Sequence, residues 1–270
     1  MLTIRAARAG DYPTFARLFP ELATGDPVPG PERFDAVLRP TTLLAEEGAA
    51  AAGYAYYEVL GDLCYVRNLV TAPDRRRAGV GRALLQRVLV LARESGCSRW
   101  CLNVKPDNTA AVRLYESFGF LPAHEGQAIR IEWDRVGGLP GEEVARALDP
   151  SEESGVERAF DLELGLLANR RAKGGLSLAV DRDGAVVAVA TFDPQFPGGY
   201  PFYASTPEDA GALLRAMRAR RATISDGGSW RERGVQIFVE RPPALAETLL
   251  GLGAERILRI LHMRAALPVA

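Results

Sequence analysis

The stretch with the clearest chemical potential is DRRRAGVGRALL, residues 74–85. It places three consecutive arginines and two glycines directly before an apolar helical pattern. The first turn of a helix exposes unpaired backbone N–H groups and carries partial positive charge. Glycine lets a ligand approach the backbone closely, and arginine adds bidentate contacts to phosphate. The stretch therefore predicts an anion-binding site, with phosphate as the expected ligand.

Two common phosphate-binding motifs do not match this stretch. A Walker loop requires GxxxxGK[ST], and no Lys-Ser or Lys-Thr pair follows here. A dinucleotide-binding turn requires GxGxxG, whereas the GVG at 79–81 is followed by RAL. The pattern that does match is R-x-x-G-x-G, which spans Arg76 to Gly81 and follows a predicted strand that ends in LVTAP (69–73).

A second motif follows in LNVKPDNTAAVRLYESFGF, residues 102–120. It contains N-x-x-A-x-x-L-Y-x-x-x-G-F, which begins at Asn108 and includes Tyr115. With both motifs in this order, residues 2–135 resemble the GNAT superfamily, the acyl-CoA-dependent N-acyltransferases. The resemblance implies acetyl-CoA (coenzyme A) as co-substrate and no metal.

The resemblance also implies a role for each matching position. Backbone amides of residues 77–82 would hold the pyrophosphate, and the backbone of 68–70 would flank the pantetheine arm like an added strand. A β-bulge near Asn68 would splay the sheet and admit the thioester. Asn108 would bond the cofactor arm, and Tyr115 would protonate the leaving thiolate. The predicted cofactor-binding residues are Asn68, Leu69, Val70, Arg76, Arg77, Ala78, Gly79, Val80, Gly81, Arg82, Asn108 and Tyr115.

The chain departs from the family pattern at the acceptor-side base. Many relatives carry Glu or Asp on the strand before L-V, whereas this chain has Arg67 and Asn68. Glu58, on the preceding strand, is the predicted catalytic partner of Tyr115 and would act through water. Asp62 and Glu46 are weaker choices for the base. No base is needed if the acceptor amine has a low pKa.

Structural roles compete with these functional roles. Tyr115 is also expected as a core aromatic behind Phe118 and Phe120, and Asn108 as a helix N-cap. Glu58 could be an ordinary polar strand residue. The two histidines, His124 and His262, stand alone without metal-ligand spacing, which argues against a metal site.

The surrounding pattern predicts the elements that position these residues. Strands are expected at 1–5, at three segments between 41 and 72, at 98–104 and at 126–134, with helices at 12–22, 81–95 and 109–118. We predict an α/β (α+β) fold with two GNAT-like domains, each a mostly antiparallel, splayed sheet flanked by helices. The predicted ranges are 1–136 for the catalytic domain, 137–155 for a linker and 156–270 for a degenerate second domain.

The second domain is predicted from a weak internal repeat. Residues 104–120 align with 238–254 as strand, proline, helix and glycine. Its predicted helix after TPEDAGALL (206–214) lacks the glycine turn and carries Glu208 and Asp209, which would repel a pyrophosphate. This domain is therefore expected to bind no cofactor. Its expected role is structural, or it forms a wall of the acceptor pocket of the first domain.

Composition limits the class of protein. The chain has 270 residues and a formal net charge of -1, which provides no overall basic field for nucleic acid. The apolar stretch at 41–60 is interrupted by three glutamates, which argues against a membrane span. Three cysteines without a CxxC pair argue against a disulfide framework or a zinc site. A soluble, cytoplasmic protein, monomeric or homodimeric, is expected.

The sequence therefore predicts an N-acetyltransferase that acts on a primary amine, expected to be a small molecule, by direct attack on the thioester. Two alternatives stay open. One is an acyl-CoA-binding sensor without turnover, and the other is a protein N-acetyltransferase.

Overall fold

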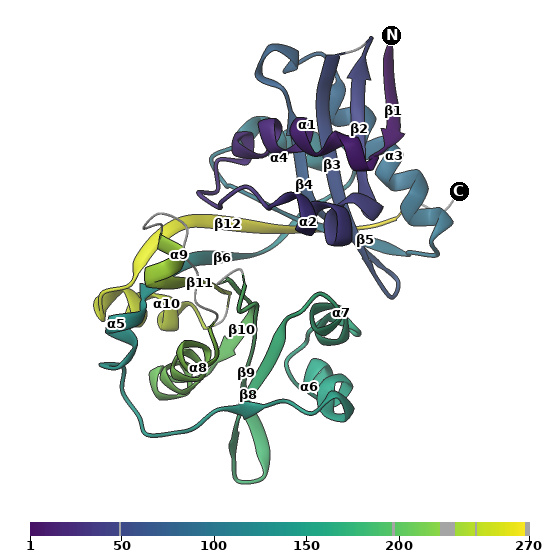
Figure 1. The fold of residues 1–270 in the computed structure, drawn as a ribbon. Coiled ribbons are helices and arrows are strands. Elements are labelled where there is room, and N and C mark those ends of the chain that lie inside the picture. The colour runs from purple at the N-terminus through teal and green to yellow at the C-terminus, as the bar shows by residue number, and fades with distance from the viewer. Residues whose placement is uncertain (49, 196–197, 222–229, 241, 268–270) are drawn as a thin grey trace. The chain divides into compact units, whose positions relative to one another are not determined.

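A computed structural model describes residues 1–48, 50–195, 198–221, 230–240 and 242–267. The chain forms two compact units (Figure 1). Unit 1 consists of Met1–Ala123 and His262–Ala270, and unit 2 of His124–Leu261. Two long strands, β6 (Leu121–Glu132) and β12 (Glu255–Ala266), begin in one unit and end in the other.

Unit 1 contains a mixed sheet whose strands are ordered β1-β2-β3-β4-β5 and then the end of β12. Its first four strands are antiparallel neighbours, and β4 pairs with β5 in parallel. The strands are β1 (Leu2–Ala6), β2 (Thr42–Glu47), β3 (Ala50–Leu60), β4 (Leu63–Thr71) and β5 (Arg99–Val104).

Helices of unit 1 cover both faces of this sheet. An aromatic cluster of Phe15, Phe34 and Tyr54 joins α1 and its neighbours to β3. On the other face α3 buries an apolar stripe with helical spacing, from Val80 to Ala92. The helices are α1 (Tyr12–Leu18), α2 (Pro31–Arg33), α3 (Val80–Glu94) and α4 (Thr109–Glu116).

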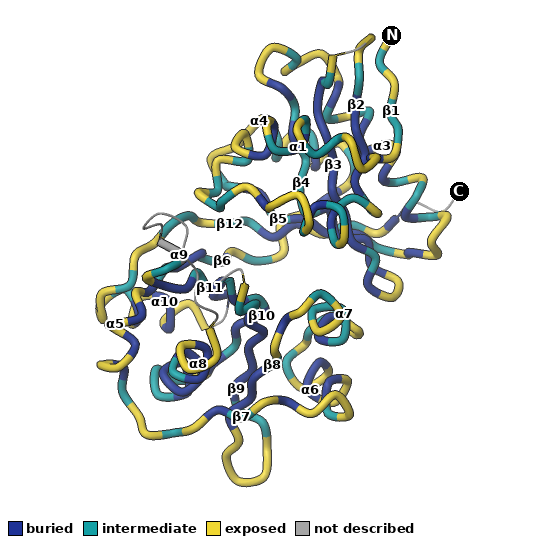
Figure 2. The backbone as a smooth tube through the Cα atoms, in the orientation of Figure 1, coloured by how far each residue is buried: buried dark blue, intermediate teal, exposed yellow. Residues whose placement is uncertain are grey.

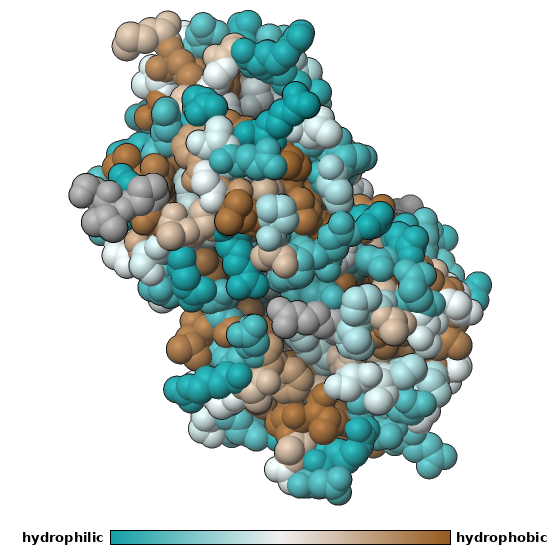
Figure 3. Space-filling model, turned by 180° about the vertical axis from the view of Figure 1, so that it is seen from behind, coloured by the Kyte–Doolittle hydropathy of each residue, from teal (hydrophilic) through white to brown (hydrophobic). Residues whose placement is uncertain are grey.

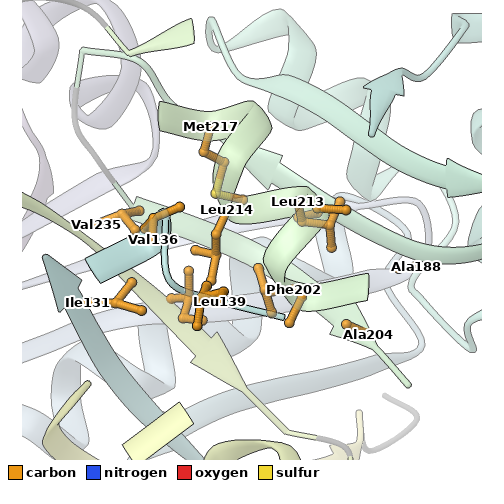
Figure 4. Close-up of a cluster of buried hydrophobic side chains, with 14 of the residues drawn as sticks. Ile131, Val136, Leu139, Ala188, Phe202, Ala204, Leu213, Leu214, Met217 and Val235 are labelled. Atoms are coloured by element: carbon orange, nitrogen blue, oxygen red, sulfur yellow. The ribbon is translucent and has the colours of Figure 1, made fainter. Parts of the chain in front are cut away.

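Unit 2 contains the rest of the same 12-stranded sheet, in the order β12-β6-β11-β10-β9-β8-β7. Its core packs α8 against the sheet through Leu213, Leu214 and Met217, with Phe202 opposite (Figure 4). The strands are β7 (Arg146–Ala147), β8 (Leu176–Arg182), β9 (Ala185–Phe192), β10 (Gly198–Ala204) and β11 (Gly234–Val239). The helices are α5 (Trp133–Val136), α6 (Glu153–Ala159), α7 (Leu166–Ala172), α8 (Pro207–Arg220), α9 (Trp230–Arg233) and α10 (Pro243–Gly251).

The central strands of each unit are the most buried parts of its backbone (Figure 2). On the face shown in Figure 3, hydrophilic residues are interspersed with smaller hydrophobic areas. Within the described ranges, every helix is too short or too polar to cross a membrane. The predicted α/β class with mostly antiparallel strands is confirmed, and the strands of both units belong to one continuous sheet of 12 strands.

Three elements differ from their predicted extent. The strand predicted at 126–134 begins at Leu121 and ends at Glu132. The predicted linker 137–155 contains β7 and a 3₁₀ turn at Pro150–Glu152. The last strand leaves unit 2 before His262, because its final residues pair in unit 1. The compact units thus have other boundaries than the predicted domain ranges, which remain a hypothesis about function.

Candidate functional site

The turn before α3 leaves its helix N-terminus open. Gly79 is the N-cap residue, with φ +82°, and no side chain caps the helix start. Glycine adopts this left-handed conformation without steric penalty. Arg77 also has a positive φ, +65°, and its side chain is exposed. Because α3 has no acidic residue in its first turn, the helix start presents donors and positive charge only.

Gly81 permits α3 and α4 to approach closely. A Cβ at this position would lie 3.3 Å from Leu114 Cδ2 and 3.6 Å from Thr71 Oγ1. The arginines on either side are anchored, since Arg76 donates to Glu21 at 2.7 Å and Arg82 donates to Ser117 at 3.0 Å. The turn predicted to bind pyrophosphate therefore lies within unit 1, packed against α4 and flanked by two hydrogen-bonded arginines.

The sheet opens next to this turn. The parallel pairing of β4 with β5 runs from Leu63 only as far as Val66, which lies opposite Leu102. Along β3, Tyr56 pairs with Asn68 but Tyr57 pairs with Val66, so Arg67 is an extra residue in β4. The bulge predicted near Asn68 is confirmed at Arg67.

The backbone of residues 68–70 lies beyond the last β4–β5 pair. On its β3 side, Leu69 pairs with Ala55 and Val70 with Tyr54. Its other edge faces the opening between β4 and β5, where an extended cofactor arm could add like a strand. The predicted contacts of Asn68, Leu69 and Val70 with the arm are compatible with this arrangement.

Asn108 and Tyr115 lie on α4. The Asn108 side chain accepts a hydrogen bond from Ala111 N at 3.2 Å and is the N-cap of the helix. Tyr115 is 6% exposed and its ring centroid lies 5.9 Å from that of Phe120. Both structural roles expected from the sequence are thus present.

Burial raises the pKa of Tyr115 above its ordinary value. The hydroxyl therefore stays protonated through neutral and moderately alkaline pH. A higher pKa also makes the phenol a weaker acid, so complete proton transfer to a thiolate with a pKa near 8.5 is uphill. Tyr115 is better suited to donate a hydrogen bond to developing negative charge on sulfur.

Glu58 lies in a buried polar pair. Its side chain is 5% exposed, and its Oε2 accepts from Arg67 Nε at 2.7 Å. Its Oε1 accepts from the Tyr56 hydroxyl, also at 2.7 Å. The guanidinium of Arg67 stacks 3.6 Å above the centre of the Tyr65 ring. Both carboxylate oxygens are engaged, so a role for Glu58 as base requires water or the Tyr56 hydroxyl as an intermediary.

The two weaker acidic residues are held by other partners. Arg99 and Ser98 bond Asp62 and lower its pKa to about 2. Arg5 bonds Glu46 and lowers its pKa. Asp62 also lies at the other end of β4 from the bulge, before Leu63. Neither carboxylate is suited to accept a proton near the opening.

One residue near the opening was set aside by the sequence analysis. His262, at the end of β12, lies in unit 1 with its Nδ1 2.8 Å from Oδ1 of Asn103. Residue spacing contains no signal for this contact, because 159 positions separate the two residues. Only the pairing of the last strand beside β5 brings them together.

The corresponding helix start in unit 2 is occupied by the protein itself. Thr206 caps α8 by accepting from Asp209 N at 3.2 Å, and Pro207 fills the first turn. The fully buried Asp209 carboxylate accepts from Arg182 at 2.5 Å. Between β10 and β11, the Tyr203 hydroxyl donates to Glu240, also at 2.5 Å.

Cysteine and histidine do not gather into a metal centre within the described ranges, and neither do carboxylates. Cys64, Cys97 and Cys101 are buried thiols, and burial raises the pKa of Cys64 and Cys97. The use of no metal remains a prediction from the family resemblance.

The glycine turn at a helix start, beside two splayed parallel strands, defines a site suited to an acyl-CoA. Comparison with known proteins agrees. Residues 12–120 match the model of the Acetyltransferase (GNAT) family. Mycothiol acetyltransferase from Saccharomonospora viridis is 30% identical over 268 residues, which cover 84% of this chain and 83% of that protein. The chain belongs to the GNAT acetyltransferase family.

Other relatives match a shorter region. [Ribosomal protein bS18]-alanine N-acetyltransferase from Escherichia coli (strain K12) is 38% identical over 77 residues, or 28% of this chain. The match spans 51% of that relative's length. A solved structure of a tandem GNAT protein from the clavulanic acid biosynthesis pathway has a TM-score of 0.62 at 17% identity and covers 100% of both chains. At that identity the likeness concerns the fold, and it agrees with two GNAT-like units.

Proposed function

We propose that unit 1 is an N-acetyltransferase that moves an acetyl group from acetyl-CoA to a primary amine of a small molecule. The observation that carries the proposal is the open helix start at Gly79 beside the strand opening that follows Val66. Amides of 77–82 would bind the pyrophosphate, and the edge of 68–70 would bind the pantetheine arm. The catalytic range 1–136 and the cofactor-free range 156–270 are parts of the same proposal.

The reaction would proceed by direct attack. The neutral amine attacks the thioester carbonyl, and a strand amide at Leu69 or Val70 stabilises the oxyanion. The C–S bond then breaks, and the Tyr115 hydroxyl stabilises the thiolate by a hydrogen bond. Glu58 would accept the amine proton through water or the Tyr56 hydroxyl. Each group acts from within unit 1.

The relatives favour a small-molecule acceptor over a protein. The relative that aligns along most of both chains is named for mycothiol, whereas the one named for a ribosomal protein aligns over 77 residues. Lysine-like acceptors also occur among the names, since thialysine N-epsilon-acetyltransferase from Sus scrofa is 26% identical over 146 residues. The acceptor class is thus a proposal that a substrate panel must test.

The test combines turnover and binding. The full chain is incubated with acetyl-CoA and a panel of small amines and peptides, while released thiol and acetylated product are measured. Product from a small amine is the expected result. Acetyl-CoA binding without thiol release from any acceptor would favour the sensor alternative, and product from peptides only would favour a protein N-acetyltransferase.

A further inference from the structure

The polar residues around the strand opening form one connected group in unit 1. Glu58, Arg67 and the Tyr65 ring are joined by the contacts described above. His262 also contacts Tyr65, with ring centroids 6.2 Å apart in an edge-on arrangement. His262 in turn contacts Asn103. The group therefore extends from β3 across β4 to β5 and β12.

This group lies at the point where the strands separate. The last β4–β5 pair is Val66 opposite Leu102, so Arg67 and Asn103 are the first residues beyond it. Tyr56 belongs to the aromatic core that contains Phe15. Glu58 lies two residues further along β3, so its side chain is on the same face of the sheet. The group therefore faces the α1 side of the sheet.

Tyr115 lies on the other side of the sheet. It packs on Phe120, whose ring centroid is 4.5 Å from that of Trp100. Trp100 and Cys101 are consecutive in β5 and point to opposite faces. Since Cys101 pairs with Tyr65, it shares the face of the polar group. A thioester in the opening would thus have Tyr115 on one side and the polar group on the other.

The contact with Asn103 selects a tautomer of His262. An amide oxygen can only accept, so Nδ1 carries the proton and donates to Asn103 Oδ1. In the neutral ring, Nε2 then carries the basic lone pair. The ring is also buried, since His262 is 8% exposed and packs edge-on against Tyr65. An oriented neutral imidazole is suited to general base catalysis.

We propose that His262, in place of Glu58, is the base that accepts the proton of the acceptor amine, and that Asn103 is the residue that positions it. The proposal rests on the acetyltransferase function of unit 1. It also assigns a residue from the C-terminal end of the chain to the N-terminal site, which explains why the sequence lacks an acidic base before L-V.

The proton and bond changes balance without any redox partner. One N–H proton of the protonated amine passes to Nε2 of His262. The amine nitrogen forms a C–N bond to the carbonyl carbon, and the C–S bond breaks. A second amine proton neutralises the thiolate, and the imidazolium returns its proton to solvent. The products are the amide, free coenzyme A thiol and one proton.

Charge around His262 is mixed. The positive Arg67 is paired with the negative Glu58. The titratable and charged groups on the same face of the surrounding strands are Tyr65 and Arg67 of β4, Glu58 of β3, Cys101 of β5 and Arg264 of β12.

Turnover of two variants tests the proposal. His262→Gln should lower kcat/KM by about 10²-fold, remove the rise of kcat/KM with pH on the acid side, and leave acetyl-CoA affinity unchanged. Added imidazole should restore part of the activity of His262→Ala. The matched control is His124→Gln, which removes the other of the two histidines and should keep the wild-type profile. A wild-type rate and acid limb in His262→Gln would overturn the proposal while acyl transfer itself stands.

A measurement independent of turnover decides the tautomer. In protein labelled with ¹⁵N-histidine, only two side chains contribute, and His124→Gln assigns the remaining signals to His262. The neutral ring should be protonated at Nδ1, and Asn103→Leu should abolish that preference. Protonation at Nε2 would overturn the proposal even if a His262 variant failed to fold. If the wild type binds acetyl-CoA but acetylates no amine, that result contradicts the acetyltransferase function itself. The proposed role of His262, which depends on that function, is then contradicted as well.

Discussion

The starts of α3 and α8 differ in what satisfies their backbone donors. At α3, Gly79 leaves the N-terminus without a side-chain cap. At α8, Thr206 caps the helix and the buried Asp209 pairs with Arg182. The same local element therefore lacks a side-chain cap in unit 1, where we propose that an anion binds, and is capped by acidic and hydroxyl side chains in unit 2. Under this proposal, the residues of the turn before the helix decide whether its N-terminus can bind phosphate.

The strand pairs beside these helices show the same contrast. In unit 1, the pairing of β4 with β5 ends at Val66. A β-bulge follows at Arg67 in β4. In unit 2, β10 and β11 pair at Gly198 and Gly199, and beyond them Tyr203 reaches across to Glu240. Side chains of the protein are thus hydrogen-bonded to each other beyond the last β10–β11 pair. This comparison supports one cofactor site per chain, a proposal that a structure with bound coenzyme A would test.

The largest expected effect comes from closing the open helix start. Gly81→Glu places a carboxylate beside the proposed pyrophosphate and meets Leu114, so coenzyme A binding should fall below detection in calorimetry. The control is Val90→Glu, which adds the same charge to an exposed position of α3 and should bind like the wild type. Wild-type affinity in Gly81→Glu would remove the assignment of this turn.

A smaller effect on activity is expected from a change at Tyr115. In the alignment of 104–120 with 238–254, the second half has Leu249 at this position and so lacks the hydroxyl. Tyr115→Phe should lower kcat by about 10²-fold, the low end for such groups, because its raised pKa limits it to hydrogen bonding. Acetyl-CoA affinity should be unchanged, since the ring still packs on Phe120. Full turnover in steady-state assays would leave Tyr115 a packing residue only.

Alkaline pH should weaken unit 1 through its buried tyrosines. Burial raises the pKa of Tyr54 and Tyr115, so each keeps its proton in the folded state above pH 10, where the unfolded chain loses it. The contribution of each tyrosine to the free energy of unfolding is therefore fully present below about pH 10. Above that pH it declines by roughly 1.4 kcal/mol per pH unit for each tyrosine.

Urea denaturation between pH 9 and 11.5, followed by a probe in unit 1, measures this slope. Tyr54→Phe should reduce it by one group, because the Tyr54 hydroxyl has no hydrogen-bond partner among the described residues. An unchanged slope in that variant would show that Tyr54 ionises without unfolding.

The smallest effect separates capping from cofactor binding. Asn108→Ala and Thr206→Ala each remove an N-cap, and each should lower the free energy of unfolding by about 1 kcal/mol. Only Asn108→Ala should also weaken coenzyme A binding, by calorimetry. Equal affinity in both variants would restrict Asn108 to its capping role.

Local patterns in the sequence were sufficient for the elements of the proposed cofactor site. The glycine turn, the helix that follows it and the cap at Asn108 depend on contacts within a few residues. Such contacts are encoded by residue type and spacing. The mixed α/β class also follows from the order of the predicted elements, whereas the joining of all strands into one 12-stranded sheet does not.

Long-range pairing decided the rest. The Glu58–Arg67 pair depends on the register of β3 with β4, which a bulge shifts by one residue. The contact of His262 with Asn103 depends on which strand the last segment joins, and the sequence assigned that strand to the second half. Residue spacing determines what a segment forms, whereas burial and strand pairing determine which distant side chains it meets. The helix start was therefore readable from the sequence, while the surroundings of the proposed base appeared only in the tertiary structure.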